Sequence, residues 1–164
     1  MRADAFAGRI LDLDGAVAWR EEQRAAGRRV VTTNGVFDLL HAGHVAYLAW
    51  ARAQGDALLV LLNEDETVRA LKGPQRPIVA FDDRARVVAA LRSVDLVTGF
   101  SERTPEVALE RLRPDVHVKS AQYRLEELPE RFVVEQHGGR IVLAPHQDGR
   151  STTDLVAAIR TPTR

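Results

Sequence analysis

The chain has 164 residues, of which 45% are hydrophobic and 28% charged, and its formal net charge at neutral pH is zero. This size and apolar content suit one globular domain with a substantial core and exclude a disordered chain. The zero net charge argues against a nucleic-acid or anionic-membrane partner, which would need a basic excess, but it allows a small anionic ligand.

Alternating strand and helix patterns run along the whole sequence. In chain order, they predict a helix over residues 15–26, a strand over 29–33, a helix over 45–54, a strand over 57–62, a loop over 72–77, a helix over 82–91, a strand over 96–100, a helix over 105–112, strands over 116–120 and 140–144, and a last helix over 153–160. The strand runs are apolar without alternation, which is typical of strands buried on both faces. We therefore expect an α/β fold, a single doubly wound, Rossmann-like domain with a five-stranded parallel sheet and ligands at the carboxyl ends of the strands.

The expected boundaries and compartment follow from the same survey. One domain spans residues 1–164, with a core over about 28–160 and a helical segment over 10–27. Cysteine is absent, which excludes disulfides and thiolate metal sites and makes the chain cytoplasmic by expectation. No basic region followed by an apolar run opens the sequence, and no apolar segment is long enough to span a membrane.

Two histidines, His41 and His44, lie where the first predicted strand leads into a helix. A helix start has unpaired backbone N–H groups and the positive end of the helix dipole, and both favour phosphate. Gly43 between the histidines suits a close approach of the backbone to a ligand. The spacing therefore favours a phosphate site, although two other interpretations stay open: ordinary capping or solvent-facing histidines, and a metal site built from Asp38, His41 and His44.

The segment Gly35-Val36-Phe37-Asp38-Leu39-Leu40-His41-Ala42-Gly43-His44 resembles the signature of the cytidylyltransferase-like nucleotidyltransferases, whose core is a His-x-Gly-His element. From about residue 10 to residue 159 the chain resembles one branch, the adenylyltransferases that make ADP-heptose from heptose 1-phosphate. The blocks that carry this likeness are residues 31–35, 63–65, 71–74, 76–78, 94–95, 104–106, 113–115 and 149–153. The resemblance implies transfer of AMP from ATP to a sugar 1-phosphate with release of pyrophosphate, Mg²⁺ that enters with the nucleotide, and a homodimer.

In this reaction the acceptor's phosphate attacks the α-phosphorus of the nucleotide. Since the attacking oxygen is already anionic, positioning and charge stabilisation are expected in place of a general base. The resemblance implies that His41, His44 and Lys72 are catalytic. It implies that the nucleotide contacts Thr33, Asn34, Gly35, Val36, Phe37, His41, Gly43, His44, Arg150, Ser151, Thr152 and Thr153. It places Asp38, Lys72, Asp95, Lys119 and Gln122 beside the acceptor, with no protein ligand to a metal.

One segment departs from the family pattern. The family continues after the lysine at position 119 with Gly-Gly-Asp-Tyr, whereas this chain has Ser120-Ala121-Gln122-Tyr123. A carboxylate that accepts hydrogen bonds is thus replaced by an amide that can also donate them. Two alternatives therefore stay open: a cytidylyltransferase acting on a polyol or alkyl phosphate such as glycerol 3-phosphate, or on a phosphonate, and a non-catalytic nucleotide-binding module. Asp95 can instead simply end the helix predicted over 82–91.

Overall fold

A computed structural model describes residues 9–145 together with Val156 and Ile159. Its elements in chain order are β1 (Arg9–Ile10), α1 (Leu13–Ala25), β2 (Val30–Gly35), α2 (Ala42–Arg52), β3 (Ala57–Asn63), α3 (Asp65–Lys72), α4 (Phe81–Ala89), β4 (Leu96–Phe100), α5 (Glu106–Leu112), β5 (Val116–Ser120), the 3₁₀ turn η2 (Leu125–Glu127), α6 (Glu130–Gln136) and β6 (Arg140–Ala144).

The strands form one parallel sheet in the order β1-β4-β3-β2-β5-β6. The predicted doubly wound parallel fold is confirmed, but the predicted number of strands is wrong, since the described residues contain six. The additional strand, β1, pairs with β4 through only two residues, Arg9 and Ile10. A run this short has no periodicity that a sequence pattern could reveal.

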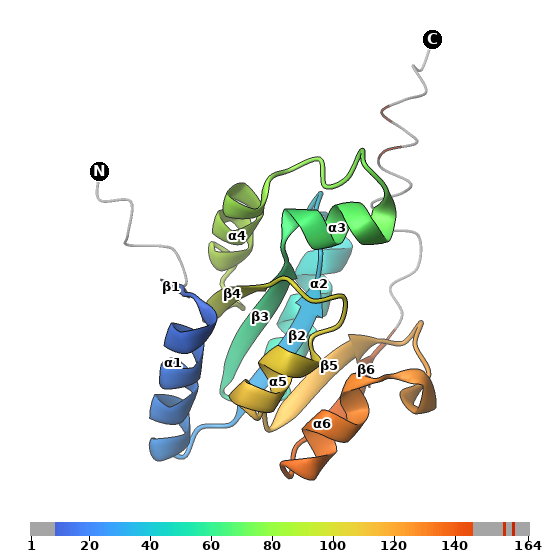
Figure 1. Cartoon of the computed structure of the whole chain (residues 1–164). Coiled ribbons are helices and arrows are strands. Elements are labelled where there is room, and N and C mark those ends of the chain that lie inside the picture. The colour runs from blue at the N-terminus through green and yellow to red at the C-terminus, as the bar shows by residue number, and fades with distance from the viewer. Residues whose placement is uncertain (1–8, 146–155, 157–158, 160–164) are drawn as a thin grey trace, which may run out of the picture.

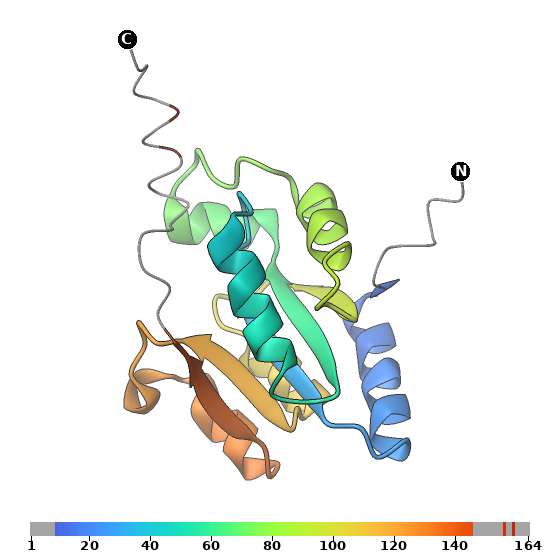
Figure 2. The same ribbon diagram turned by 180° about the vertical axis from the view of Figure 1, so that it is seen from behind.

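Helices cover both faces of the sheet (Figures 1 and 2). Alternate residues of β3 point to opposite faces, so Leu58, Val60 and Leu62 pack with α2 and α4, whereas Ala57, Leu59 and Leu61 pack with α1, α5 and α6. Two hydrophobic cores result, and β3 belongs to both. This explains why its sequence is apolar at every position except its last residue.

Two helices, α3 and α6, have no counterpart in the elements expected from the sequence. Helix α3 has only eight residues, and just two of them, Thr67 and Val68, are buried. Helix α6 has seven residues, including Phe132, Val133 and Val134, whose side chains lower helix propensity. Both are too short for a helical pattern to stand out. The helix predicted over 153–160 lies outside the described residues, apart from Val156 and Ile159.

The chain reverses its direction of winding beside β2. From β2 it runs outward to β3 and β4, and it then returns to place β5 and β6 on the other side of β2. The carboxyl ends of β2 and β5, at Gly35 and Ser120, are therefore neighbours at the switch point of the sheet. Crevices at such switch points are where doubly wound sheets bind their ligands.

Candidate active site

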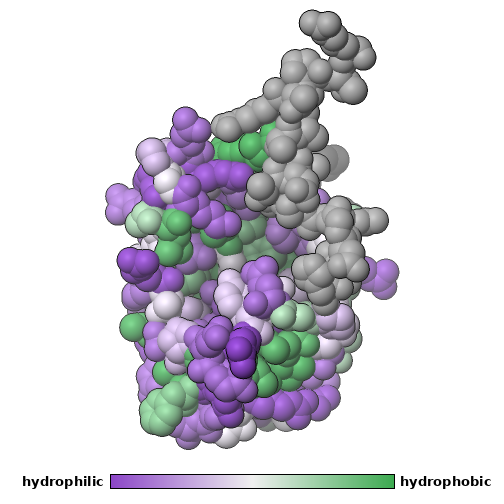
Figure 3. All heavy atoms as spheres, turned by 90° about the vertical axis from the view of Figure 1, so that its right-hand side faces the viewer, coloured by the Kyte–Doolittle hydropathy of each residue, from purple (hydrophilic) through white to green (hydrophobic). Residues whose placement is uncertain are grey.

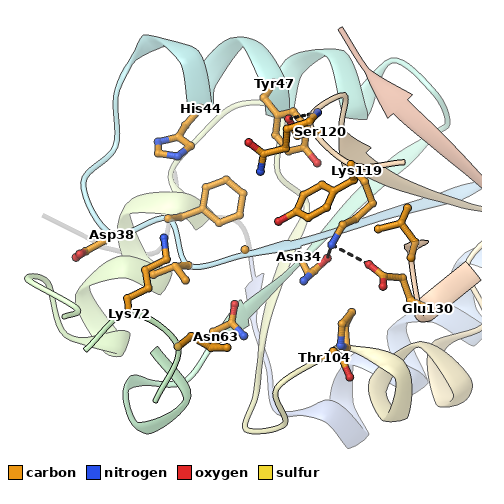
Figure 4. Close-up of a pocket in the computed structure, with 18 of the residues that line it drawn as sticks. Asn34, Asp38, His44, Tyr47, Asn63, Lys72, Thr104, Lys119, Ser120 and Glu130 are labelled. Carbon is orange, nitrogen blue, oxygen red and sulfur yellow. Dashed lines mark hydrogen bonds and ion pairs between the residues drawn. The ribbon is translucent and has the colours of Figure 1, made fainter. Parts of the chain in front are cut away.

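A pocket of about 670 Å³ opens at this switch point. The ends of β2 and β5, the first turn of α2, the last residue of α3 and the start of α6 all contribute to its wall. Figure 4 shows that its labelled residues form two groups: Asp38, His44 and Lys72 lie on one side, and Lys119 and Glu130 on the other.

Most residues that the sequence predicted for the site line this pocket. They are Asn34, Gly35, Val36, Phe37, Asp38, His41, Gly43, His44, Lys72, Lys119 and Gln122. Thr33 does not line it, because its side chain is buried beneath, where its hydroxyl donates to the Val118 carbonyl at 2.9 Å and lies 2.7 Å from the Tyr47 hydroxyl. Arg150, Ser151, Thr152 and Thr153 lie outside the described residues.

The structure does not bring Asp95 to the pocket. This residue directly precedes β4, so it lies at the amino end of the sheet, opposite the ligand side. Its carboxylate accepts the Leu58 N–H at 2.8 Å and pairs with Arg52 at 3.0 Å. The predicted acceptor role is therefore corrected to a structural one, in which Asp95 ties the amino ends of two strands to α2.

The loop between β2 and α2 begins with a tight reversal of the backbone. Phe37 has a φ of 47°, a left-handed conformation that side-chain-bearing residues seldom adopt. A Cβ on Gly35 would lie 2.8 Å from a carbon of the Phe37 ring. Glycine at position 35 thus gives the ring room to fold back, and the ring then packs against His44 with centroids 5.2 Å apart.

The two histidines of the His-x-Gly-His element stack on each other. Their ring centroids are 3.9 Å apart and their planes differ by 27°. His41 caps α2, since its Nδ1 accepts the Gly43 N–H at 3.1 Å, while its carbonyl accepts the N–H of His44 at 2.9 Å. The helix start therefore presents imidazole groups and the positive end of the dipole, because the backbone N–H groups of Gly43 and His44 are already bonded.

The surroundings of His44 keep its imidazole neutral. Burial, followed by the electrostatic effects of the neighbouring His41 and Lys72, lowers the pKa of His44 to about 4. A neutral imidazole has one N–H donor. His44 can thus donate a hydrogen bond to an anionic oxygen, and a bound anion would favour its protonation.

Lys72 lies at the end of α3, directly before the segment to which Asp38 is bonded. Lys72 was expected on a loop, but it is the last residue of α3, which ends where Gly73 adopts a φ of 94°. Lys72 is exposed on the pocket wall and has no carboxylate partner in the described part of the chain.

Asp38 is buried and fully engaged. Its carboxylate pairs with Arg76 at 2.6 Å and accepts the N–H groups of Ile78 and Val79 at 2.8 and 2.9 Å. Burial alone would raise the pKa of Asp38, but these two N–H groups and the Arg76 guanidinium outweigh it and hold the pKa below its usual value. The carboxylate therefore fixes the loop that follows Lys72 and does not project into the pocket as a free group.

The opposite side of the pocket holds a buried ion pair. Lys119 is the penultimate residue of β5, on the ligand side, and its Nζ lies 2.7 Å from Glu130 Oε1 and 2.9 Å from Asn34 Oδ1. Sequence reasoning missed Glu130, because α6 itself was not expected. A glutamate directly after Pro129 has the pattern of a helix start, and that pattern was the available signal.

His117 lies in β5, within the strand expected over residues 116–120, and its Nε2 is 3.9 Å from Glu130 Oε1 of this ion pair. It is fully buried, and its Nδ1 lies 2.8 Å from the Thr32 hydroxyl. Burial, followed by the charge of Lys119, lowers the pKa of His117 to about 3. His117 is therefore a neutral core residue at physiological pH.

A protein-built metal centre finds no support in this arrangement. The described residues contain no group of three or more histidine, aspartate or glutamate side chains placed to hold a metal ion. The candidate set of Asp38, His41 and His44 is not available as a ligand set, because Asp38 is bound to Arg76 and to backbone N–H groups. In the same part of the chain, no helix is both long enough and apolar enough to cross a membrane.

Comparisons with known proteins place the chain among nucleotidyltransferase relatives. A family model described as cytidylyltransferase-like matches residues 32–158. The "Bifunctional protein HldE" of Gluconacetobacter diazotrophicus is 49% identical over 160 residues, covering 96% of this chain and 33% of that protein. The protein of the same name from Caulobacter sp. is 48% identical, covering 98% of this chain and 33% of its own length. The chain thus spans about a third of the length of these curated relatives.

Two solved structures share the fold. A lipopolysaccharide core biosynthesis protein from Thermoplasma volcanium superposes with a TM-score of 0.62 at 24% identity, covering 76% of this chain and all of the other. A pantoate-beta-alanine ligase from Francisella tularensis, in complex with beta-gamma ATP and beta-alanine, has a TM-score of 0.59 at 12% identity and covers 94% of this chain and 77% of that one. At these identities the comparison concerns the fold alone.

Proposed function

The chain belongs to the cytidylyltransferase-like family of nucleotidyltransferases, and from this premise we propose that it transfers AMP from ATP to a sugar 1-phosphate, with a heptose 1-phosphate as the acceptor. The observation that supports this most directly is the cationic side of the switch-point pocket, where His41 and His44 stack at the start of α2 opposite Lys72. Support for the heptose acceptor comes from the residue blocks shared with ADP-heptose-forming adenylyltransferases and from the relatives named HldE.

The proposed reaction needs little beyond placement and charge. An oxygen of the acceptor's phosphate attacks the α-phosphorus of ATP, a new P–O bond forms, the bond to the β-phosphate breaks, and pyrophosphate leaves. No proton has to be removed from the nucleophile, so a general base is unnecessary. The residues of the site act by holding the two phosphates in line and by stabilising charge on the non-bridging oxygens.

Each residue on the cationic side has a defined part in this proposal. Neutral His44 donates its N–H to an oxygen of the triphosphate, and His41, whose Nδ1 is already an acceptor for Gly43, donates from Nε2. Lys72, which is free of carboxylates in the described structure, lies between the attacking and the transferred phosphates. We propose that Ser151, Thr152, Thr153 and Arg150 hold the leaving phosphates, as the family resemblance implies.

Mg²⁺ fits this site as an ion that enters with the nucleotide. The buried carboxylates of the pocket, Asp38 and Glu130, are occupied by Arg76 and Lys119, and Mg²⁺ commonly relies on phosphate oxygens with few protein ligands. When bound, Mg²⁺ neutralises part of the charge of the triphosphate. The protein's own residues then orient the α-phosphorus toward the acceptor.

The test is a survey of substrate pairs. Purified protein and Mg²⁺ are incubated with ATP or CTP, each against heptose 1-phosphate, mannose 1-phosphate and glycerol 3-phosphate, while released pyrophosphate is measured and products are identified by mass. We expect ATP with heptose 1-phosphate to give the fastest release and an ADP-sugar. A preference for CTP with glycerol 3-phosphate would replace the proposal with a cytidylyltransferase. Nucleotide binding without release from any pair would indicate a non-catalytic module.

A further inference from the structure

The side of the pocket away from the histidines contains an ion pair that the proposed chemistry does not use. Lys119 and Glu130 line the pocket, yet only 10% and 2% of their side-chain surfaces are exposed. The Lys119 ammonium has three N–H donors; it donates one hydrogen bond to Asn34 Oδ1 and forms an ion pair with Glu130. Its Nζ also lies 4.9 Å from the centre of the Tyr123 ring. Lys119 is therefore fixed in place and is not a mobile surface lysine.

The charges of the pocket are divided unequally between its two sides. Glu130 neutralises Lys119, so this buried pair carries no net charge, whereas Lys72 on the other side has no carboxylate partner among the described residues. A phosphate placed against Lys119 would also approach the Glu130 carboxylate and be repelled by it. The phosphates of both substrates therefore belong on the Lys72 side.

The paired side offers both donors and acceptors of hydrogen bonds. The Lys119 ammonium donates, the Glu130 carboxylate accepts, and the amides of Asn34 and Gln122, which also line the pocket, can do both. Hydroxyl groups both donate and accept, so a pair of neighbouring hydroxyls matches this set better than a charged group does. Figure 4 shows Asn34 beside the ammonium of Lys119, with Glu130 on its other side.

We propose that Lys119, Glu130 and Asn34 form a neutral subsite that recognises a vicinal diol of a substrate, with Glu130 as the residue that determines specificity. The inference rests on the proposed function only in that both substrates of that reaction carry such diols. The ribose of the nucleotide and the sugar ring of the acceptor are the two sources. Glu130 accepts hydrogen bonds from the diol while its charge cancels that of Lys119.

The experiment measures binding without turnover, in two arms. In the nucleotide arm, calorimetry compares ATP with 2′-deoxy-ATP and 3′-deoxy-ATP. In the acceptor arm, it compares heptose 1-phosphate with analogues that lack one ring hydroxyl. Both arms use the wild-type protein, Glu130→Gln, and the double variant Lys119→Met with Glu130→Leu, which removes the pair without leaving a buried charge behind. Glu135→Gln on the same helix, whose exposed pair with Arg131 is at 2.7 Å, is the matched control.

In one of the two arms, we expect the wild type to bind the parent ligand about tenfold more tightly than the deoxy ligand, because a hydrogen bond to a charged group is lost. Glu130→Gln and the double variant should bind parent and deoxy ligands within about twofold of each other in that arm, whereas Glu135→Gln should behave as the wild type. The arm that responds identifies the ribose or the acceptor sugar as the diol.

The subsite is refuted if the wild type does not discriminate in either arm, or if both variants discriminate as the wild type does. The double variant guards against misfolding of Glu130→Gln, since it tests the same subsite without an unpaired lysine. Absence of pyrophosphate release from the wild type, with discrimination in a binding arm intact, would count against the proposed reaction alone. No binding of any of these ligands by the wild type would overturn both.

Discussion

At the scale of single residues, the site depends on how neighbours set the state of each side chain. His44 stacks on His41 and faces Phe37, and burial, followed by the electrostatic effects of His41 and Lys72, lowers its pKa to about 4. It therefore serves as a preorganised neutral donor in the free protein. Anionic oxygens that develop charge in the transition state gain most from such a fixed donor.

Replacing His44 tests this interpretation. We expect His44→Ala to lower the rate of pyrophosphate release by about 10²–10³, as the loss of one preorganised transition-state donor typically does. Single-turnover kinetics with saturating ATP separates this loss from weaker binding. His137→Ala is the control. His137 pairs with Glu110 and does not line the pocket, so this variant should leave the rate unchanged. An unaltered rate in His44→Ala would remove this residue from the mechanism.

The predicted residues that line the pocket and those that do not differ in how local their signal is. The residues of the His-x-Gly-His element follow one another in the sequence, so their spacing alone placed them at one helix start. Asp95 and Glu130 gave no such signal, because the side of the sheet on which a residue lies depends on strand boundaries and on a short helix that the pattern does not reveal. Thr33 was misplaced by the period of two in a strand, since its neighbour Asn34 points into the pocket while Thr33 is buried beneath it.

At the scale of elements, Asp38 joins two loops. It lies in the loop that follows β2, and its carboxylate binds Arg76, Ile78 and Val79 in the segment between α3 and α4. The loop between β2 and α2, which leads to His41 and His44, and the segment that follows Lys72 are thereby held together. The geometry between His44 and Lys72 thus depends on a carboxylate that need not touch either substrate.

Asp38→Asn should loosen this connection. An amide oxygen can accept one or two of the bonds but lacks the charge that pairs with Arg76, so we expect the free energy of unfolding to fall by about 1–3 kcal/mol. Hydrogen exchange of the Ile78 and Val79 amides should rise in parallel. Asp14→Asn, at the exposed pair with Arg111, provides the comparison and should change neither quantity appreciably. Unchanged exchange at residues 78 and 79 would show that the loop is held by other contacts.

A buried arginine in α4, Arg84, connects the loop after β2 with the end of β3 and with α3. The Arg84 guanidinium donates to the carbonyls of Val36, Asn63 and Val79 and pairs with Asp65 at 2.6 Å. Its side chain is completely buried. One cation thus ties the carboxyl ends of β2 and β3 to the start of α3 and to the loop before α4.

We expect Arg84→Met to lower the free energy of unfolding by about 3 kcal/mol, because three carbonyls and a carboxylate would lose their shared donor. Chemical denaturation measures the change. Arg86→Met lies on the same helix, but Arg86 is exposed and its pair with Asp83 spans 3.4 Å, so this control should cost less than about 0.5 kcal/mol. Equal losses in the two variants would mean that the network around Arg84 contributes nothing beyond an ordinary side chain.

At the scale of the whole molecule, the net charge is zero, but the charged side chains are distributed unevenly around the pocket. Most of the face drawn in Figure 3 is hydrophilic, with hydrophobic side chains scattered among the polar ones. The fold class followed from the sequence because β-branched and leucine-rich runs repeat along the chain, and each run forms one strand of the sheet. The division of the pocket into a cationic and a neutral side could not be predicted, because it arises from pairs such as Lys119 with Glu130 and Asp38 with Arg76, whose members come from different elements.

The stability of the whole fold should fall in mild acid because two histidines are held neutral. The pKa of His44 is lowered to about 4 and that of His117 to about 3, in each case mainly by burial. In the unfolded chain both take up a proton below pH ~6.5, whereas in the folded chain they do not until the pH is far lower. The unfolded state therefore binds more protons in this window, and the free energy of unfolding decreases as the pH falls from about 6.5 toward 4.

Each such proton contributes a slope of up to about 1.4 kcal/mol per pH unit. His117 should supply about half of the effect, since both histidines remain largely neutral in the folded chain over this window; it is fully buried, and Lys119 nearby opposes its charge. Urea denaturation at a series of pH values measures the slope. His117→Asn, which keeps a polar partner for Thr32, should reduce the slope by up to that same amount, about 1.4 kcal/mol per pH unit. An equal slope in this variant and in the wild type would show that His117 is not a neutral core residue. In that case the folded protein would already hold a protonated His117, stabilised by Glu130 at 3.9 Å.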